Sequence, residues 1–107
     1  MALRIYHVSL DLIRKVRPLL DRIRTKDPNL ADQLSRALTS VPINLSEGSY
    51  AQGRNARARF FTALASAGEV KACLEVAQAF EYIGELDAAL RDELDHVIAT
   101  VYRLVHG

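Results

Sequence analysis

The segment Arg36–Gly48 has the sequence RALTSVPINLSEG, in which apolar residues recur at the spacing of an amphipathic helix. Pro42 lies inside this segment, although proline in a helix interior removes one backbone hydrogen bond and clashes with the preceding turn. Asn44 and Glu47 follow three residues apart, on one helix face and beside apolar core positions. Gly48 is predicted to end the helix as a C-cap glycine. Because a kink and two polar side chains are costly in a buried helix, the surrounding structure is expected to satisfy them.

Helical periodicity continues on both sides of this segment and predicts four helices. No stretch shows the alternation of polar and apolar residues that is typical of a strand. The connections between the helices are short, which favours antiparallel neighbours. The sequence therefore predicts an all-α fold, an antiparallel up-down-up-down four-helix bundle that forms a single domain over residues 1–107. The expected helices cover about residues 4–25, 28–48, 55–83 and 86–105.

Proline, aspartate and asparagine mark the expected bends and ends of these helices. Pro18 is predicted to bend the first helix, because the apolar spacing continues in phase beyond it. A break at Arg17 into two short helices is the alternative. Asp27 is the expected N-cap of the second helix, with Pro28 as its first residue, and Asn55 is the expected N-cap of the third.

The predicted third helix is apolar on two sides, and Gly84 is expected to end it. A surface helix needs only one apolar stripe, so a second stripe suggests contact with another partner. The first face holds Phe60, Leu64, Ala67, Leu74 and Ala77, and the second holds Phe61, Ala65, Ala72, Val76 and Phe80.

The composition excludes several classes of protein. A chain of 107 residues, half of them hydrophobic, is long enough to form one core. The single cysteine excludes an internal disulfide framework. The N-terminal residues carry charge too early for a signal peptide, and no apolar run is long enough to span a bilayer. These features predict a soluble, cytoplasmic protein with no membrane association.

Charge is unevenly distributed along the chain, although the net charge is only +1. Residues 1–68 hold eleven Arg or Lys and five Asp or Glu, whereas residues 69–107 hold three and eight. Such asymmetry can orient an anionic partner or drive self-assembly of basic against acidic surfaces. It is equally compatible with a role in solubility alone.

Ser40, Pro42, Asn44, Glu47 and Gly48 form the strongest polar motif. One hypothesis is that they form a binding pocket. The other is a hydrogen-bonded network that compensates the Pro42 kink, either by binding the carbonyl that proline leaves without a partner or by contacting a facing helix. We favour the structural hypothesis, because buried polar residues more often specify packing than catalyse a reaction.

Arginines gather at the start of the predicted third helix, and no acidic residue lies between Glu47 and Glu69. Arginines in the first turn of a helix oppose its macrodipole, a small penalty that a phosphate would relieve. The nearby aromatic residues Tyr50 and Phe60 are candidates to stack on exposed bases. The alternative is a solvated surface, or an intersubunit surface paired with acidic residues. The candidate nucleic-acid-binding residues are Arg36, Arg54, Arg57, Arg59 and Tyr50.

Two short motifs resemble known sites in a context that does not support them. Residues 48–55 imitate the spacing of a P-loop, but they lack its lysine and follow a helix instead of a strand. Glu93 and His96 have the Glu-x-x-His spacing of di-iron bundles, but neither His7 nor His106 supplies the second copy that such a site needs. No metal centre and no cofactor is expected.

Arg91 and His96 are similar to the Arg-x4-His motif of the HEPN ribonucleases, helical proteins that act on RNA. In such a site His96 would move a proton and Arg91 would stabilise developing charge. The acidic residues Asp92, Glu93 and Asp95 surround the pair and would repel RNA, and a step of five residues separates the two side chains around the helix. The sequence therefore favours a protein without enzymatic activity, with a HEPN-like ribonuclease as the alternative.

The central motif and the third helix resemble a known family, the four-helix-bundle proteins encoded in intervening sequences of bacterial 23S rRNA genes. The accessory proteins of diversity-generating retroelements belong to the same superfamily. This chain has Ala65-Ser66 where the family commonly has Gly-Ser, and residues 44–48 read NLSEG where the family has NIAEG. The matching residues are Pro28, Gln33, Arg36, Ala37, Ser40, Val41, Pro42, Asn44, Glu47 and Gly48, with Phe60, Leu64, Ser66, Glu69 and Leu74 in the third helix.

This resemblance implies a homopentamer of bundles packed around a five-fold axis. From the retroelement relatives it implies binding of nucleic acid and association with a reverse transcriptase. It implies no activity that can be transferred residue by residue. The sequence thus predicts a non-enzymatic, homo-oligomeric scaffold whose partner is RNA, DNA or a protein. A purely protein-binding adaptor is a further alternative.

Overall fold

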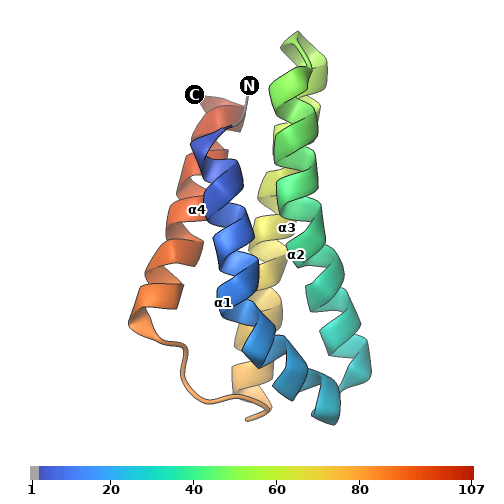
Figure 1. Ribbon diagram of the computed structural model, residues 1–107, viewed down its shortest axis with the longest axis vertical. Coiled ribbons are helices and arrows are strands. Elements are labelled where there is room, and N and C mark those ends of the chain that lie inside the picture. Colours follow the sequence, from blue (N-terminus) through green and yellow to red (C-terminus); the bar gives the residue numbers. More distant parts are fainter. Residues whose placement is uncertain (1–2) are drawn as a thin grey trace.

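The computed structural model describes residues 3–107, which form four helices and no strand (Figure 1). The helices are α1 (Arg4–Lys26), α2 (Pro28–Tyr50), α3 (Gly53–Ala79) and α4 (Ala88–His106). Successive helices run in opposite directions and pack side by side, and α4 returns to α1, which closes the bundle. The predicted all-α, up-down-up-down four-helix bundle is confirmed.

The core lies along one stripe of each helix, as the apolar spacing predicts. Leu12 and Val16 of α1 are almost completely buried, and Val97 and Val101 of α4 repeat the same spacing opposite them. Burying one such side chain contributes about 1.5–3 kcal/mol, so these stripes supply most of the driving force for folding. The other large, fully buried side chains include Ile23, Leu34, Val41, Leu45, Val70, Leu74 and Leu94.

The turn between α1 and α2 matches its prediction. The α1 helix continues through Pro18, and α2 begins at Pro28 directly after its N-cap, Asp27. The Asp27 carboxylate accepts a hydrogen bond from the backbone N–H of Leu30 at 3.0 Å and another from the Tyr82 hydroxyl at 3.2 Å. One carboxylate therefore caps α2 and also anchors the connection between α3 and α4.

Gly48 does not end α2, which corrects the sequence prediction. The helix continues to Tyr50, and Ala51 is its C-cap. A Cβ atom built on Gly48 would lie only 2.5 Å from Cε1 of Phe60 on α3. Glycine is needed at this position because the ring of Phe60 packs directly on the α2 backbone, not because the helix stops there.

Both ends of α3 also differ from the prediction. The helix begins at Gly53, where φ is +57°, with Gln52 and not Asn55 as its N-cap. It ends at Ala79, four residues before the predicted end, and Gly84 plays no part in ending it.

A Schellman-type turn closes α3. Glu81 adopts φ of 61°, its N–H binds the carbonyl of Gln78 at 2.9 Å, and the N–H of Tyr82 binds the carbonyl of Ala77 at 2.9 Å. A non-glycine residue thus takes the left-handed position, which sequence rules assign to glycine. Leu86 is buried in the connection that follows, and α4 begins at Ala88, two residues later than predicted.

Lys15 joins α1 to α4 through carboxylates on both helices. Its ammonium lies 3.0 Å from Asp11 and also pairs with Glu93. The Glu93 and Asp11 carboxylates raise the pKa of Lys15, and the Lys15 ammonium lowers the pKa of Asp11. No helix among residues 3–107 combines the length and apolar character needed to cross a membrane.

Gly48→Ala should lower the free energy of unfolding by about 1 kcal/mol. The loss expected from forcing the Phe60 ring aside, about 1–3 kcal/mol, exceeds the gain of about 1 kcal/mol from replacing a helical glycine with alanine. Urea denaturation would measure this. Gly84→Ala is the control, because nothing lies within 4 Å of its Cβ position and its φ is not left-handed, so this change should not lower the free energy of unfolding. A Gly48→Ala variant as stable as Gly84→Ala would contradict this account of the contact.

Candidate nucleic-acid interface

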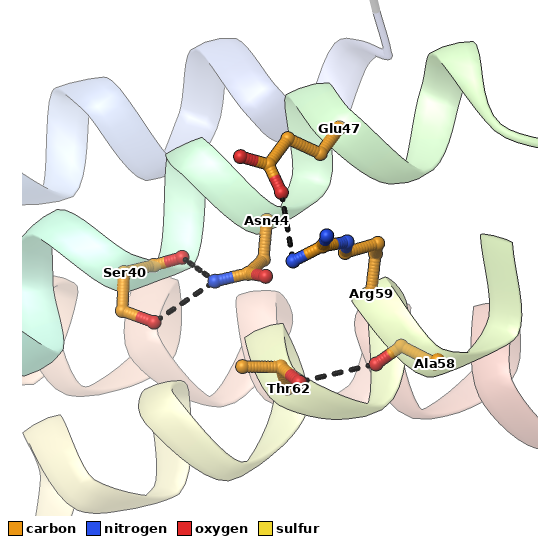
Figure 2. A network of polar contacts seen from close by, with 6 residues as sticks. All are labelled: Ser40, Asn44, Glu47, Ala58, Arg59 and Thr62. Atoms are coloured by element: carbon orange, nitrogen blue, oxygen red, sulfur yellow. Dashed lines mark hydrogen bonds and ion pairs between the residues drawn. The ribbon is translucent and has the colours of Figure 1, made fainter. Parts of the chain in front are cut away.

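Ser40 and Asn44 are hydrogen-bonded to each other on α2 (Figure 2), and Ser66 joins this network to α3. Asn44 is only 8% exposed, and its Nδ2 donates to the carbonyl of Ser40 at 2.9 Å and to the Ser40 hydroxyl at 3.0 Å. The hydroxyl of Ser66 on α3 donates to the same Ser40 hydroxyl at 2.7 Å. Among the described residues, no buried side-chain nitrogen or oxygen lacks a hydrogen-bond partner.

This network contacts the facing helix and does not repair the backbone at Pro42. Proline at position 42 leaves the carbonyl of Leu38 without its helical donor. The Asn44 side chain binds the carbonyl of Ser40 instead. Of the two structural roles that the sequence left open, the observed contacts correspond to cross-helix packing.

Glu47 does not belong to the network, although it lies only three residues from Asn44. It is half-exposed and pairs with Arg59 of α3, with Oε2 and Nη1 2.9 Å apart (Figure 2). Three residues correspond to a rotation of about 300° around a helix, which is enough to move Glu47 from the interface to its rim. The expectation of a buried Glu47 is wrong. An exposed ion pair of this kind adds little stability.

The tip formed by α2 and α3 projects beyond the ends of α1 and α4 (Figure 1). Two hollows lie beside the first turns of α3, and Ala58 and Thr62 line both of them. The α2-side hollow has a volume of about 770 Å³ and contains the Glu47–Arg59 pair. Its lining residues are Ser46, Glu47, Tyr50, Ala51, Asn55, Ala58, Arg59 and Thr62.

The α4-side hollow faces the C-terminal end of α4 and has a volume of about 570 Å³. Arg54 and Arg57 are exposed along it, and within residues 3–107 neither forms an ion pair or a side-chain hydrogen bond. Phe61 and His106 also line it, so cationic and aromatic groups share one surface. Its lining residues are Arg54, Arg57, Ala58, Phe61, Thr62, Val105 and His106.

The structure therefore divides the predicted arginine cluster. Arg54 and Arg57 face α4, whereas Arg59 turns towards α2, where Glu47 compensates its charge. Tyr50 is 75% exposed but lines the α2-side hollow with Arg59. Arg36 is exposed on α2, about 20 Å from the end of that helix at a rise of about 1.5 Å per residue, so it does not join the other candidates.

Phe61 is the residue that the sequence analysis missed as a stacking candidate. Phe60 was expected in that role, but its ring is partly buried against the core and packs on Gly48. Phe61 is 57% exposed, because adjacent residues on a helix point about 100° apart. The sequence carried a usable signal, since Phe61 is on the second apolar face of α3, which is exposed.

That second face of α3 is exposed along much of its length. Val76 and Phe80 are exposed large apolar residues, and Ala65, Gly68 and Ala72 are exposed between them and the helix start. No other helix of the described chain covers these positions.

Arg91 and His96 are not brought together on α4. The Arg91 guanidinium donates to the carbonyl of Leu86 at 3.3 Å and lies 3.7 Å from Glu85, both on the side of the helix start. His96 is exposed and lies five residues in the opposite direction. The pair therefore lacks the convergent geometry that joint action on one phosphate requires.

Two other candidate chemical groups, Glu93 and Cys73, are accounted for by an ion pair and by burial in the core. Glu93 pairs with Lys15, and among residues 3–107 no three His, Cys, Asp or Glu side chains are grouped as metal ligands. Cys73 is buried in the core, and burial, with a smaller effect of Glu69, raises the pKa of its thiol. A raised pKa keeps the thiol protonated and unreactive.

Comparison with known proteins identifies a family and a fold. A family model described as the 23S rRNA-intervening sequence protein matches residues 1–103. The chain belongs to this family. The family assignment covers nearly the whole chain and agrees with the resemblance in the central motif.

A solved structure shows the same fold as this 23S rRNA-intervening sequence family member. It is a protein of unknown function from the S23 ribosomal protein family of Bacteroides thetaiotaomicron, with a TM-score of 0.84 at 20% sequence identity. The match covers 96% of this chain and 99% of that one. At this identity the likeness establishes the fold alone. No curated protein is significantly similar to this chain.

Asn44→Leu and Ser66→Ala should each lower the free energy of unfolding, by about 1–3 kcal/mol, because they remove hydrogen bonds between buried groups. Chemical denaturation would measure the change. Thr39→Ala is the control, since the Thr39 hydroxyl only binds the Ser35 carbonyl on the exposed side of α2, at 2.9 Å. An Asn44→Leu variant that is as stable as Thr39→Ala but has lost a ligand would instead assign Asn44 to a binding site.

Proposed function

We propose that this protein is a non-enzymatic, homo-oligomeric scaffold that binds structured nucleic acid through the arginine-bearing end of α3. The supporting observation is the pair Arg54 and Arg57, both exposed and neither matched by a carboxylate within the described chain. Phosphate is a group that such a pair binds well, because guanidinium donors match its oxygen atoms and its charge.

The surroundings of the two arginines favour an anion. Glu47 is the nearest acid before them in sequence and Glu69 the nearest after them, and Glu47 already pairs with Arg59. On the other side of the hollow, α4 ends with basic residues, Arg103 and His106, in its last turn. Acidic residues concentrate in the second part of the chain, towards the other end of the bundle. The molecule therefore offers one basic end to a polyanion.

The exposed face of α3 supports self-association. It combines Val76 with the small residues Ala65, Gly68 and Ala72, which permit close approach of a second backbone. Contiguous exposed apolar surface of this kind commonly marks an interface. Five copies is the number that the family resemblance implies. In a ring, several weak basic ends would act together on one nucleic acid and gain affinity through avidity.

Arg54→Ala/Arg57→Ala should weaken binding to a labelled, structured RNA, as measured by fluorescence anisotropy across a salt series. The slope of log K against log salt should become shallower by roughly 1.4–1.8, at about 0.7–0.9 for each lost phosphate contact. Arg17→Ala/Arg22→Ala, which removes the same charge from exposed positions of α1, is the matched control. Arg59→Ala should weaken RNA binding less than Arg54→Ala or Arg57→Ala alone, because Glu47 already compensates the charge of Arg59.

Two results would contradict the nucleic-acid part of this proposal. One is an equal weakening of RNA binding by Arg17→Ala/Arg22→Ala, which would show that binding depends only on net charge. The other is no binding even at low salt, which would leave a scaffold whose partner is another protein.

Ala72→Glu/Val76→Glu should reduce the oligomer to a single chain, because it places charge in the centre of the proposed interface. Native mass spectrometry would report the number of copies. Ala99→Glu, on an exposed position of α4, should leave the assembly intact. If the native protein is already monomeric, or the α3 variant keeps its oligomeric mass, the α3 face is not the interface.

A further inference from the structure

We infer that the α4-side hollow binds one unpaired nucleotide of the nucleic acid, with its base on Phe61 and its phosphate on Arg54 and Arg57. This inference rests on the proposed function and narrows it, from nucleic acid in general to segments that present an unstacked base. It distinguishes the site from a basic surface that recognises only the backbone of a duplex.

The three side chains lie on one face of α3. Residues 54, 57 and 61 fall within about 60° of one another around a helix, and their spacing along the axis is about 4–6 Å per step. All three line the same hollow, with the buried Val105 of α4 in its wall. Arg54 and Arg57 at the start of α3 are thus followed, one turn later, by the Phe61 ring at the α4-side hollow.

The size of the α4-side hollow and its openness to solvent suit a nucleotide. Its volume of about 570 Å³ falls in the range of small-molecule sites, about 300–1,000 Å³. His106 lies on the α4 side, where its ring packs on Tyr102 with the ring centroids 4.4 Å apart. The imidazole is therefore positioned by a neighbour and provides a polar group at the margin of the hollow.

Phe61 is distinguished from the other exposed phenylalanine of α3 by its surroundings. Phe80 is 63% exposed, but its ring stacks on Tyr82 at 5.1 Å and is followed by Glu81. Phe61 forms no aromatic stack within residues 3–107, and its neighbours are cationic. A ring with a free face beside arginines is the combination that binds single-stranded nucleic acid, in which the base stacks and the phosphate pairs.

A duplex would not use this aromatic ring. Its bases are paired and stacked inside the duplex, so the Phe61 ring would meet only the sugar-phosphate exterior. Sequence-tolerant recognition of loops and single strands depends instead on bases that are free to stack on protein aromatics. The exposed ring of Phe61 beside Arg54 and Arg57 therefore predicts a preference for unpaired nucleotides.

The test compares three fluorescently labelled probes by anisotropy, with the native oligomeric protein and with Phe61→Leu and Phe80→Leu variants. The probes are a short oligouridine, a blunt-ended RNA duplex without a loop, and an oligomer of abasic units that carries the same number of phosphates. Phe61→Leu should weaken oligouridine binding by at least about fivefold, the effect of losing about 1 kcal/mol of stacking. Duplex binding by Phe61→Leu should be unchanged. All binding by Phe80→Leu should also be unchanged, and its native mass is measured as well because Phe80 lies on the exposed apolar face of α3.

The abasic probe separates stacking from phosphate binding. The native protein should bind it as weakly as Phe61→Leu binds oligouridine, because both lack one partner of the stack. An oligodeoxyuridine of equal length identifies the source of the nucleotide: equal affinity would assign recognition to base and phosphate, and tighter binding of the ribose form would add the 2′-hydroxyl.

Several results would overturn the inference, each with a different meaning for the proposed function. Unchanged oligouridine binding by Phe61→Leu, or tight binding of the abasic probe, would leave a phosphate-binding surface without a base site. No binding of any probe by the native protein would remove the proposed nucleic-acid function as well. A change in oligomeric mass in Phe61→Leu would make Phe61 an interface residue and not a ligand contact.

Discussion

The ring of Phe60 lies on the backbone of α2 at Gly48, and two turns further along α2 the Ser40–Ser66 hydrogen bond joins the same two helices. A side chain at position 48 would displace the Phe60 ring, and the Ser40 and Ser66 hydroxyls, 2.7 Å apart, also require the two helices to lie close together. The α2–α3 pair is therefore held by one steric and one polar constraint. The chain thus places polar residues inside a bundle core, where an apolar contact alone would leave helix register less well defined.

This helix pairing determines which arginines remain available. Because α3 is held with Phe60 facing α2, Arg59 also turns towards α2 and meets Glu47. Arg54 and Arg57 point to the opposite side, where α4 ends below the projecting tip. The same rotation that buries Phe60 exposes Phe61. The basic and aromatic character of the α4-side hollow is thus a direct consequence of the close α2–α3 contact.

The two ends of the bundle have different chemistry. The tip carries arginines and a free aromatic face, whereas the opposite end is organised by Asp27, which caps α2 and accepts a hydrogen bond from Tyr82. Between them, the exposed apolar face of α3 offers a surface for another copy. In the proposed scaffold, the surface for assembly lies along α3 and the surface for the ligand lies at its first turns, so different residues of one helix would serve the two roles.

The sequence by itself determined the four helices, their antiparallel order and the Asp27–Pro28 helix start, because apolar periodicity and capping chemistry are local properties. It also identified the arginines and the polar motif as unusual. Only the tertiary structure decided that Gly48 is a packing glycine, that Glu47 lies at the surface and that Phe61, not Phe60, is free to stack. The physical reason is that sequence spacing shows which residues share a helix face, whereas the rotation of each helix against its neighbours decides which face meets solvent.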